Sequence, residues 1–437
     1  MPCGVRYIKR MQDLKICLVA IAKNEAAYLA GWIFHHLFFG FDEIHIWVND
    51  TNDSSHEILK IINLEFSNVK IIDGDDLLKK CQDANENFQL HAYNASIGVA
   101  RASACSHVMC LDIDELWTPS NFTTSIKEIA SAMDCDVVAF PWAVDEASHG
   151  TEPFSPPFKQ SMSLERGFHV KSLARITDRL IGAYIHSFLV NDGIYCLPSG
   201  QPFPIKNNNS YEIINNNYYD NKNFFSEEFF ILHLVHKSPI EYVASLSRGR
   251  KHANDHSLFK INRIGFKNIV PLVEASFEFQ KLKIYYDEMK IFISRCGLAE
   301  LLQAEHQRVL SRGLSNLSVF RQLREYRFKY RRVLRGLNLS DLNKADEERA
   351  EVEMHIDSSE FNEGKFLIRG WVYNAGELVR RPAVYVRGVY VDCHYHEYER
   401  ADVTAVKQYE GKAYGFEIRG EVAANPLISV QDVELLF

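Results

Sequence analysis

In the first 140 residues, short apolar runs alternate with segments of helical character, and this alternation constrains the fold more than any other feature of the sequence. The apolar runs occupy residues 16–22, 44–49, 69–72, 107–113 and 136–142, and we interpret each as a buried strand. Residues 25–39 are helix-prone, and Glu25 supplies the negative charge that suits a helix N-terminus. The order strand, helix, strand is typical of βαβ units. The sequence therefore predicts an α/β domain with a mainly parallel sheet.

The residue composition of the sequence changes after residue 145. Pro, Asn and Gly are frequent in 145–225, which predicts long loops. Within them, 200–223 is our candidate for a mobile flap, with an idle insertion as the alternative. Residues 238–345 have predominantly helical character. From about residue 351, apolar and polar residues alternate in short runs, which predicts a small antiparallel β domain.

Charge, hydropathy and cysteine usage narrow the class of protein. A formal net charge of −8 argues against nucleic-acid binding, which needs a basic surface. The N-terminal residues lack the apolar stretch of a signal peptide, and no segment reaches the ~18 apolar residues that span a bilayer, so we predict a cytoplasmic protein. The nine cysteines form no CxxC pair and several lie in apolar runs, so we interpret them as buried, reduced thiols.

Three carboxylates follow the apolar run in VMCLDIDELW, and they carry the clearest chemical signal. In an extended chain Asp112 and Asp114 face the same side, so we expect them to project together from the carboxyl end of a strand, where open α/β sheets bind ligands. One or two carboxylates together with phosphate oxygens hold Mg²⁺ or Mn²⁺. The alternative is an acidic N-cap that opens a helix.

Groups of polar residues flank these carboxylates in a fixed order. Lys23, Asn24 and Glu25 follow the first strand, a helix then carries Trp32 and His36, and the second strand ends in a turn with Asn49, Asp50, Asn52 and Asp53. Further along the chain come Gln89, Ala92, Tyr93 and Asn94, then Lys171, Arg175 and His186, and finally His233, His236, Ser238, Arg248 and Gly249.

Together with Asp112, Asp114 and Glu115, these groups resemble the motifs of family 2 type glycosyltransferases close to the family 92 branch, over residues 16–250. The resemblance implies a Rossmann-like GT-A fold, an enzyme, and a nucleotide-sugar donor, with UDP as the nucleotide. It assigns donor binding to Asn24, Glu25, Asn49, Asp50, Gln89, Asp112, Lys171, Arg175 and Arg248. It assigns Mn²⁺ or Mg²⁺ to Asp112 and Asp114. His233 ends an apolar run and either completes the metal shell or contacts the diphosphate.

The chain departs from the family pattern in two places. Leu246 and Ser247 stand where a lysine usually precedes the Arg–Gly pair, and Leu234 replaces an aromatic residue after the first histidine. Transferases of this type usually invert the anomeric centre, which requires a general base. Our candidates for the base are Asp145 and Glu146, and the alternative is a solvated loop pair.

Two further segments bear on the acceptor. The basic stretch 320–337 has apolar residues at helical spacing, so it either lies on an anionic membrane surface at the inner face of the membrane or packs on the core. The last 85 residues resemble a β module found behind many bacterial glycosyltransferases, with Gly370, Trp371, Arg400, Asp402 and Gly415 as matches. This implies a glycan or lipid-linked acceptor in the synthesis of surface polysaccharide, as in lipopolysaccharide or capsule.

We therefore predict a glycosyltransferase in three parts: a GT-A domain (1–250), a helical segment (251–345) and a C-terminal β-sandwich-like domain (351–437). One rival is a sugar nucleotidyltransferase, which needs a glycine-rich phosphate loop where this chain has AKNEAAYL. The other is a carbohydrate-binding or scaffold protein with a degenerate transferase domain. Metal-dependent nucleotide binding separates the transferase from this scaffold.

Overall fold

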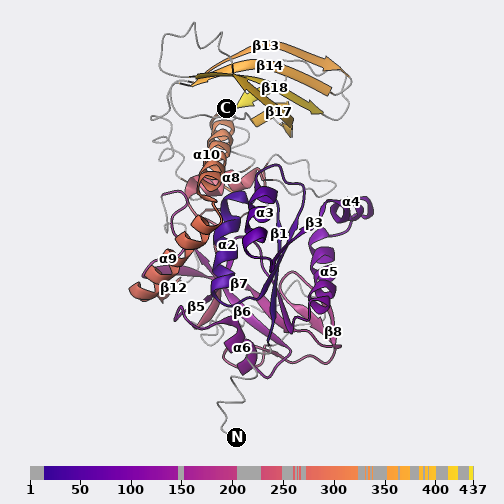
Figure 1. Cartoon of the computed structure of the whole chain (residues 1–437), viewed down its shortest axis with the longest axis vertical. Helices are drawn as coiled ribbons and strands as arrows, with labels where there is room; N and C mark the ends of the chain where they lie inside the picture. Colours follow the sequence, from indigo (N-terminus) through magenta and orange to yellow (C-terminus); the bar gives the residue numbers. More distant parts are fainter. Residues whose placement is uncertain are drawn as a thin grey trace. The chain divides into compact units, whose positions relative to one another are not determined.

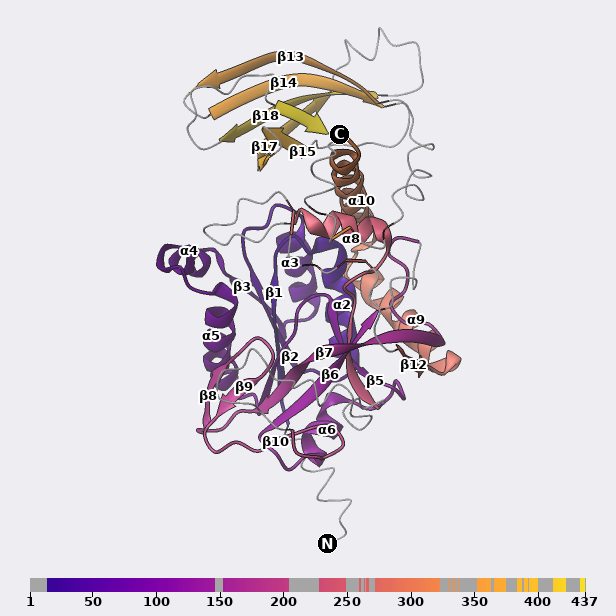
Figure 2. The same ribbon diagram turned by 180° about the vertical axis from the view of Figure 1, so that it is seen from behind.

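The computed structural model describes residues 14–145, 152–203, 228–248, 259–260, 263, 265–266, 272–322, 330, 333–334, 337, 352–362, 365–374, 383–386, 389–391, 393–399, 412–421 and 433–436. The chain forms two compact units (Figures 1 and 2). The first unit comprises Met1–Ser238, Lys251–Asn254 and Asn268–Gln307, and the second comprises Pro239–Arg250, Asp255–Lys267 and Arg308–Phe437.

A large sheet forms the centre of the first unit, with the strand order β3-β2-β1-β4-β7-β6-β11-β5. Its strands are β1 (Ile16–Ala22), β2 (Glu43–Val48), β3 (Val69–Asp73), β4 (His107–Cys110), β5 (Glu115–Pro119), β6 (Val137–Asp145), β7 (Ser161–Arg175) and β11 (Phe229–His233), with β10 (Tyr195–Cys196) beside β6 and β12 (Leu272–Ser276) beside β7. Strands β3, β2, β1 and β4 are parallel, whereas β7 runs antiparallel to both β4 and β6. The predicted α/β class with a parallel sheet is confirmed for the first four of these strands.

Helices cover both faces of this sheet (Figures 1 and 2). The helices of the first unit are α2 (Ala26–Phe38), α3 (Ser55–Glu65), α4 (Asp75–Ala84), α5 (Phe88–Ala102), α6 (Ile126–Ala132) and α9 (Phe279–Arg295). Along β1, Leu18 and Ala20 pack with α2 and α3, while Cys17 and Val19 pack with α5. This alternation follows from the period of two in a strand. Because both faces of β1 are covered by helices, every residue of this strand is apolar.

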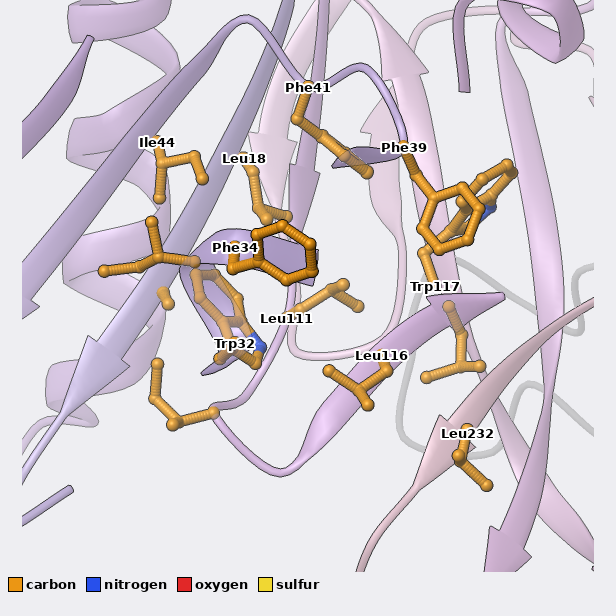
Figure 3. Packing of buried hydrophobic residues seen from close by; sticks show 14 of the residues in the cluster. Leu18, Trp32, Phe34, Phe39, Phe41, Ile44, Leu111, Leu116, Trp117 and Leu232 are labelled. Atoms are coloured by element: carbon orange, nitrogen blue, oxygen red, sulfur yellow. The ribbon is translucent and has the colours of Figure 1, made fainter. Parts of the chain in front are cut away.

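The largest apolar cluster lies on the α2 face of the sheet. Figure 3 shows Trp32 and Phe34 of α2 in this cluster together with Leu111, Leu116 and Trp117 from the segment around β5. These side chains are 6% exposed or less. The helix that follows the first strand is therefore packed directly against the chain that carries the predicted carboxylates.

The structure corrects several predicted elements. Strand β4 ends at Cys110 and not at residue 113. The segment 145–225, predicted as long loops, contains the 15-residue strand β7 as well as β8 (Leu180–Ala183), β9 (Phe188–Val190) and β10. Strand β7 escaped prediction because its polar residues and glycine interrupt the apolar pattern, although it lies in the middle of the sheet. The flap candidate at 200–223 lies outside the described residues apart from its first four positions.

Two cysteines also differ from the prediction. Cys135, just before β6, and Cys196, the last residue of β10, form a disulfide, so the expectation of reduced thiols is wrong at these positions. Cys17, Cys81, Cys105, Cys110 and Cys296 are buried free thiols, as predicted. The two bonded cysteines are 61 residues apart, and a separation of this kind leaves no sequence signal for pairing.

The second unit contains helix α8 (Pro239–Leu246), part of α10 (Ala299–Gln322), and the C-terminal strands. A four-stranded antiparallel sheet has the order β13-β14-β18-β17, and a three-stranded antiparallel sheet has the order β16-β15-β19. These strands are β13 (Val352–Asn362), β14 (Lys365–Asn374), β15 (Ala383–Val386), β16 (Val389–Val391), β17 (Cys393–Glu399), β18 (Lys412–Glu421) and β19 (Val433–Leu436). The antiparallel character predicted for the C-terminal part is confirmed.

The helical prediction for 238–345 is confirmed at α8, α9 and α10 and is wrong at Leu272–Ser276, which forms β12. Of the basic stretch 320–337, Gln322 ends α10 and residues 323–329 lie outside the described part of the chain. Among the described residues, no helix combines the length and apolarity needed to cross a membrane.

Candidate functional site

The predicted carboxylates lie in a tight turn between β4 and β5. After Cys110 the chain leaves β4, turns at residues 113–114 and enters β5 at Glu115. The backbone N–H of Asp112 donates to the Oε2 atom of Glu115 over 2.8 Å, which closes the turn. The N-cap alternative is therefore wrong, because the turn leads into a strand and not into a helix.

Trp32 of α2 holds the backbone of this turn. Its indole N–H lies 3.0 Å from the carbonyl oxygen of Asp112 and 2.9 Å from that of Glu115, so it donates to both ends of the turn. The Trp32 side chain is 2% exposed, which fixes the orientation of its N–H group. The tryptophan of the predicted helix thus has a structural role at the carboxylates.

We expect Trp32→Phe to lower the free energy of unfolding by about 1–3 kcal/mol, because two buried carbonyl oxygens lose their shared donor. Urea denaturation measures this loss. Trp47→Phe is the matched control, since the buried Trp47 donates to Ser96 over 2.7 Å on the other face of the sheet. A Trp32→Phe variant with the stability of the wild type would contradict this role of Trp32.

A buried lysine joins two of the carboxylates. The Nζ atom of Lys171, on β7, lies 3.1 Å from Glu115 and 3.3 Å from Asp112, and both Lys171 and Glu115 are fully buried. Burial alone would lower the pKa of Lys171, but the two carboxylates outweigh it and raise the pKa above its ordinary value. Burial raises the pKa of Glu115 to about 7, against the opposing effect of Lys171.

Helix α5 supplies the remaining partners of Asp112. Gln89 and Tyr93, four residues apart, share one face of the helix and donate to the Oδ1 atom of Asp112 over 3.1 and 3.3 Å. Asn87 caps the helix by accepting from the backbone N–H of Gln89 over 2.9 Å. Burial raises the pKa of Tyr93 well above its ordinary value, so its hydroxyl stays a donor. Even so, 38% of the Asp112 side chain is exposed.

Asp114 points toward a different neighbour. The Oδ1 atom of Asp114 lies 3.7 Å from Nε2 of His233, the last residue of β11. The Nδ1 atom of His233 is buried and has no hydrogen-bond partner among the described residues. Its ring centroid lies 4.2 Å from that of Trp142.

The pair of Asp114 and His233 fits a divalent cation. Ligand atoms that each lie ~2.1 Å from one ion are at most about 4.2 Å apart, so a separation of 3.7 Å allows both to share an ion. A carboxylate suits Mg²⁺ or Mn²⁺, and an imidazole suits later transition metals. Asp112 differs because the Lys171 cation already occupies its Oδ2 atom. Of the three predicted ligands, Asp114 and His233 therefore have the better geometry.

Lys23, Asn24 and Glu25 follow β1, and the turn that begins with Asn49 and Asp50 follows β2, the parallel neighbour of β1. The two turns are tied together: Asn24 donates from its backbone N–H to Thr51 over 3.1 Å, and its Oδ1 atom accepts from the backbone N–H of Asn52 over 2.8 Å. Lys23 pairs with Asp50 at 2.5 Å. Both Asn24 and Asp50 have positive φ, 53° and 44°, a conformation that asparagine and aspartate adopt more readily than other residues.

Two of the predicted donor-binding residues in these turns are buried. Glu25 and Asn49 are each 6% exposed, and the Oδ1 atom of Asn49 has no hydrogen-bond donor among the described residues. A buried amide oxygen without a donor costs free energy unless a water or ligand satisfies it. The structure thus brings Asn24, Glu25, Asn49 and Asp50 together at the edge where Asp112 and Asp114 lie.

Arg175 lies away from this edge. Arg175 pairs with His107 at the opposite end of β4, and its guanidinium donates to the carbonyl of Met133 over 3.3 Å. Arg248 belongs to the second compact unit. Of the proposed bases, Glu146 lies outside the described residues.

Asp145, the other proposed base, is 2% exposed. Its two carboxylate oxygens accept from the backbone N–H groups of His236 and Lys237 over 3.1 and 2.7 Å. This arrangement fits an anchor for the chain after β11 better than a proton acceptor.

Sequence reasoning missed the aromatic surroundings of His233. Trp142 contacts the rings of His169 and His186 as well as that of His233, and the two other histidines stack with centroids 4.5 Å apart. No local motif identifies this group, because its members come from β6, β7, β11 and the turn after β8.

One more group of metal-binding residue types lies elsewhere. Cys81, Glu86 and His91 have potential ligand atoms within 4.8 Å of one another, the only such group of three or more among the described residues. Burial raises the pKa of the Cys81 thiol, which opposes the thiolate form that metals bind. His91 and Glu86 are about half exposed and pair with each other at 2.8 Å.

Comparison with known protein families and with curated proteins finds no family model and no curated protein that matches this chain. The family resemblance therefore stays a prediction that rests on the order of the motifs.

Proposed function

We propose that this chain is a metal-dependent glycosyltransferase of the GT-A type, which transfers a sugar from a nucleoside diphosphate sugar, with UDP as the nucleotide, to a glycan or lipid-linked acceptor. The observation that carries the proposal is the turn with Asp112 and Asp114 at the carboxyl end of β4, beside the turns that follow β1 and β2. Open α/β sheets bind ligands at this edge. The synthesis of bacterial surface polysaccharide is the setting that the sequence resemblance favours.

The turns after β1 and β2 would hold the nucleoside. Asn49 offers a buried amide oxygen that lacks a donor, which a base N–H or a ribose hydroxyl satisfies. Lys23 and Asp50 neutralise each other, so the nucleoside meets no net charge from this pair. Asp112, fixed by Gln89, Tyr93 and Lys171, has its donors in place before any ligand arrives.

Asp114 and His233 would hold the cation, whose positive charge stabilises the diphosphate as it leaves. Lys171 keeps a positive charge buried beneath the carboxylate turn and offsets the repulsion among its three carboxylates. The protein therefore holds Asp112 with a lysine and leaves Asp114, beside His233, for the metal.

We expect UDP with Mn²⁺ to raise the melting temperature of the protein by several degrees, because a ligand at about a hundred times its Kd adds about 3 kcal/mol to the free energy of unfolding. Asp114→Ala should remove the part of the shift that depends on the metal. Differential scanning fluorimetry with UDP, GDP, CDP and dTDP, each with and without Mn²⁺, measures this. Asp178→Ala, an exposed residue between β7 and β8, is the control.

A shift that survives Asp114→Ala, or one that needs no metal, contradicts the proposed metal site. A protein that responds to no nucleotide favours the carbohydrate-binding alternative.

A further inference from the structure

Trp142 is set apart from its neighbours in the central sheet. Residues 137–141 of β6 are all buried, whereas Trp142 is only partly buried. Its indole N–H is buried and has no hydrogen-bond partner among the described residues. A large aromatic side chain with one unpaired polar atom and a partly open surface is typical of a ligand-contacting position.

Two local features of β7 depart from regular strand geometry opposite Trp142. Pro141 pairs with Val170 and Ala143 with Arg166, so the extra residues of a bulge lie on β7, opposite Trp142. On the facing strand, a Cβ atom at Gly167 would lie 2.4 Å from the Cβ of Trp142, closer than real Cβ contacts allow. A bulge bends the strand that carries it and is common next to active sites. Here the bulge and the glycine together make room for Trp142.

The ring of Trp142 meets the candidate site through His233. The ring centroids of Trp142 and His233 are 4.2 Å apart, and Nε2 of His233 is 3.7 Å from Asp114. His169 and His186 contact Trp142 nearly edge-on, with interplanar angles of 75° for both rings. Burial lowers the pKa of both imidazoles, so they are neutral near pH 7. The Nδ1–H of His186 donates to the carbonyl of Val170 over 3.1 Å, which leaves its Nε2 atom as an acceptor.

The strand order places Trp142 on the side of the carboxylates that faces away from the proposed nucleoside turns. Along the sheet, β2 and β1 carry the proposed nucleoside turns, β4 leads to Asp112 and Asp114, and β7, β6 and β11 follow. Trp142 therefore lies across the carboxylate turn from the nucleoside. In a nucleoside diphosphate sugar, the group beyond the diphosphate is the sugar.

We propose that Trp142 is the platform on which the transferred sugar of the donor lies, with the apolar C–H face of the pyranose ring against the indole and its hydroxyl groups toward the neighbouring imidazoles. The assignment to the donor sugar rests on the proposed function. The platform itself rests on the bulge, on Gly167 and on the ring contacts, and it predicts carbohydrate binding even without nucleotide.

The first experiment measures binding of methyl pyranosides of glucose, galactose, mannose and N-acetylglucosamine by saturation-transfer NMR. Wild-type protein should bind at least one of them, and Trp142→Ala should lose roughly tenfold in affinity, whereas Trp142→Phe retains most of it. Gly167→Ala should reproduce the loss without changing the tryptophan, because the new methyl group displaces the ring. A melting curve shows whether Gly167→Ala folds, and if it does not, the pair of Trp142 variants decides.

The second experiment compares UDP with UDP-glucose and UDP-N-acetylglucosamine by calorimetry in the presence of Mn²⁺. Trp142→Ala should leave the affinity for UDP unchanged and abolish the additional affinity that the sugar contributes. Equal loss for UDP and UDP-sugar overturns the proposal, since Trp142 then acts only by packing on His233. The proposal is also overturned if Trp142→Ala raises the KM for the acceptor while the sugar still adds its full affinity to that of UDP.

The outcomes separate this inference from the proposed function. Binding of a pyranoside that depends on Trp142, in a protein that binds no nucleotide, supports the platform and contradicts the transferase. Nucleotide binding that depends on Asp114, without any pyranoside binding or sugar increment, supports the transferase and overturns the platform.

Discussion

Lys171→Met should lower the free energy of unfolding by about 3–5 kcal/mol at pH 8, the range measured when one partner of a buried ion pair is removed. Lys171 and Glu115 are both fully buried, so the substitution leaves a carboxylate without its cation in the protein interior. Methionine fills a similar volume, which keeps the packing change small. Chemical denaturation at fixed pH measures the loss.

The loss should shrink as the pH falls. Burial raises the pKa of Glu115 in the folded protein to about 7, above the ordinary value of 4.5, and removal of Lys171 raises it further. For an acid with a raised folded pKa, the folded state binds the extra proton, so stability falls as pH rises from 4.5 through the folded pKa. The variant at pH 6 can protonate Glu115 and avoid the buried charge.

Two controls make this prediction specific. Lys171→Met with Glu115→Gln should recover most of the stability, because the amide is neutral and can still accept from the backbone N–H of Asp112. Lys70→Met should cost ~1 kcal/mol or less, since Lys70 is 40% exposed in its pair with Glu43. If the double variant is no more stable than Lys171→Met, the loss comes from packing and not from charge.

Acid should destabilise the protein through two buried histidines of α2. His35 donates from Nε2 to the carbonyl of Trp117 over 2.8 Å and accepts at Nδ1 from the hydroxyl of Tyr285 over 3.0 Å. His36 accepts at Nε2 from the backbone N–H of Trp117 over 3.4 Å, so its Nδ1–H donates to Trp32 over 2.8 Å. Burial lowers the pKa of His35 to about 3 and that of His36 well below its ordinary value.

A base with a lowered folded pKa stabilises the protein fully above its unfolded pKa of 6.5, and this stability is lost as the pH falls toward the folded value. Each such histidine costs about 1.4 kcal/mol per pH unit in that window. His35→Gln keeps a donor for Trp117 and an acceptor for Tyr285 but cannot titrate. The stability difference between wild type and His35→Gln should therefore shrink by about 2 kcal/mol between pH 7 and pH 5.

Urea titrations at half-unit pH steps test this difference, and comparison of two proteins cancels the other titrating groups. His91→Gln, at a side chain that is 46% exposed, serves as the control. Parallel curves for wild type and His35→Gln would show that His35 does not carry the acid sensitivity.

Periodicity predicts the elements that a continuous apolar pattern marks, and it misses those whose pattern is interrupted. The strands at 16–22 and 69–72 and the helix after the first strand were found because continuous apolar runs and 3.6-residue spacing are local properties. Strand β7 was missed, although it supplies Lys171 to the site. Its burial depends on β4 and β6, which lie far from it in sequence, and tertiary contacts of this kind leave no local pattern.

The candidate site was predictable to the extent that its residues follow strand ends. Asp112, Asp114, Asn24 and Asn49 lie at one sheet edge because parallel strands share a carboxyl end. The partners of these residues were not predictable as contacts, since Lys171 and Trp142 reach the site through antiparallel pairing and a bulge. Asp145 shows the opposite case. Its position in the sequence suggests a general base, but its carboxylate accepts hydrogen bonds from two backbone N–H groups.

Because Trp32 donates hydrogen bonds to both ends of the carboxylate turn, the turn cannot keep its shape outside this protein. Its shape is enforced from a helix some 80 residues earlier in the chain, so a peptide with the sequence LDIDEL would lack the donor that closes it. A graft of this segment onto another sheet would need the tryptophan and the helix that orients it. The smallest part of the protein that can display these carboxylates correctly thus extends from β1 through β11, because β7 supplies Lys171 and β11 pairs with β5.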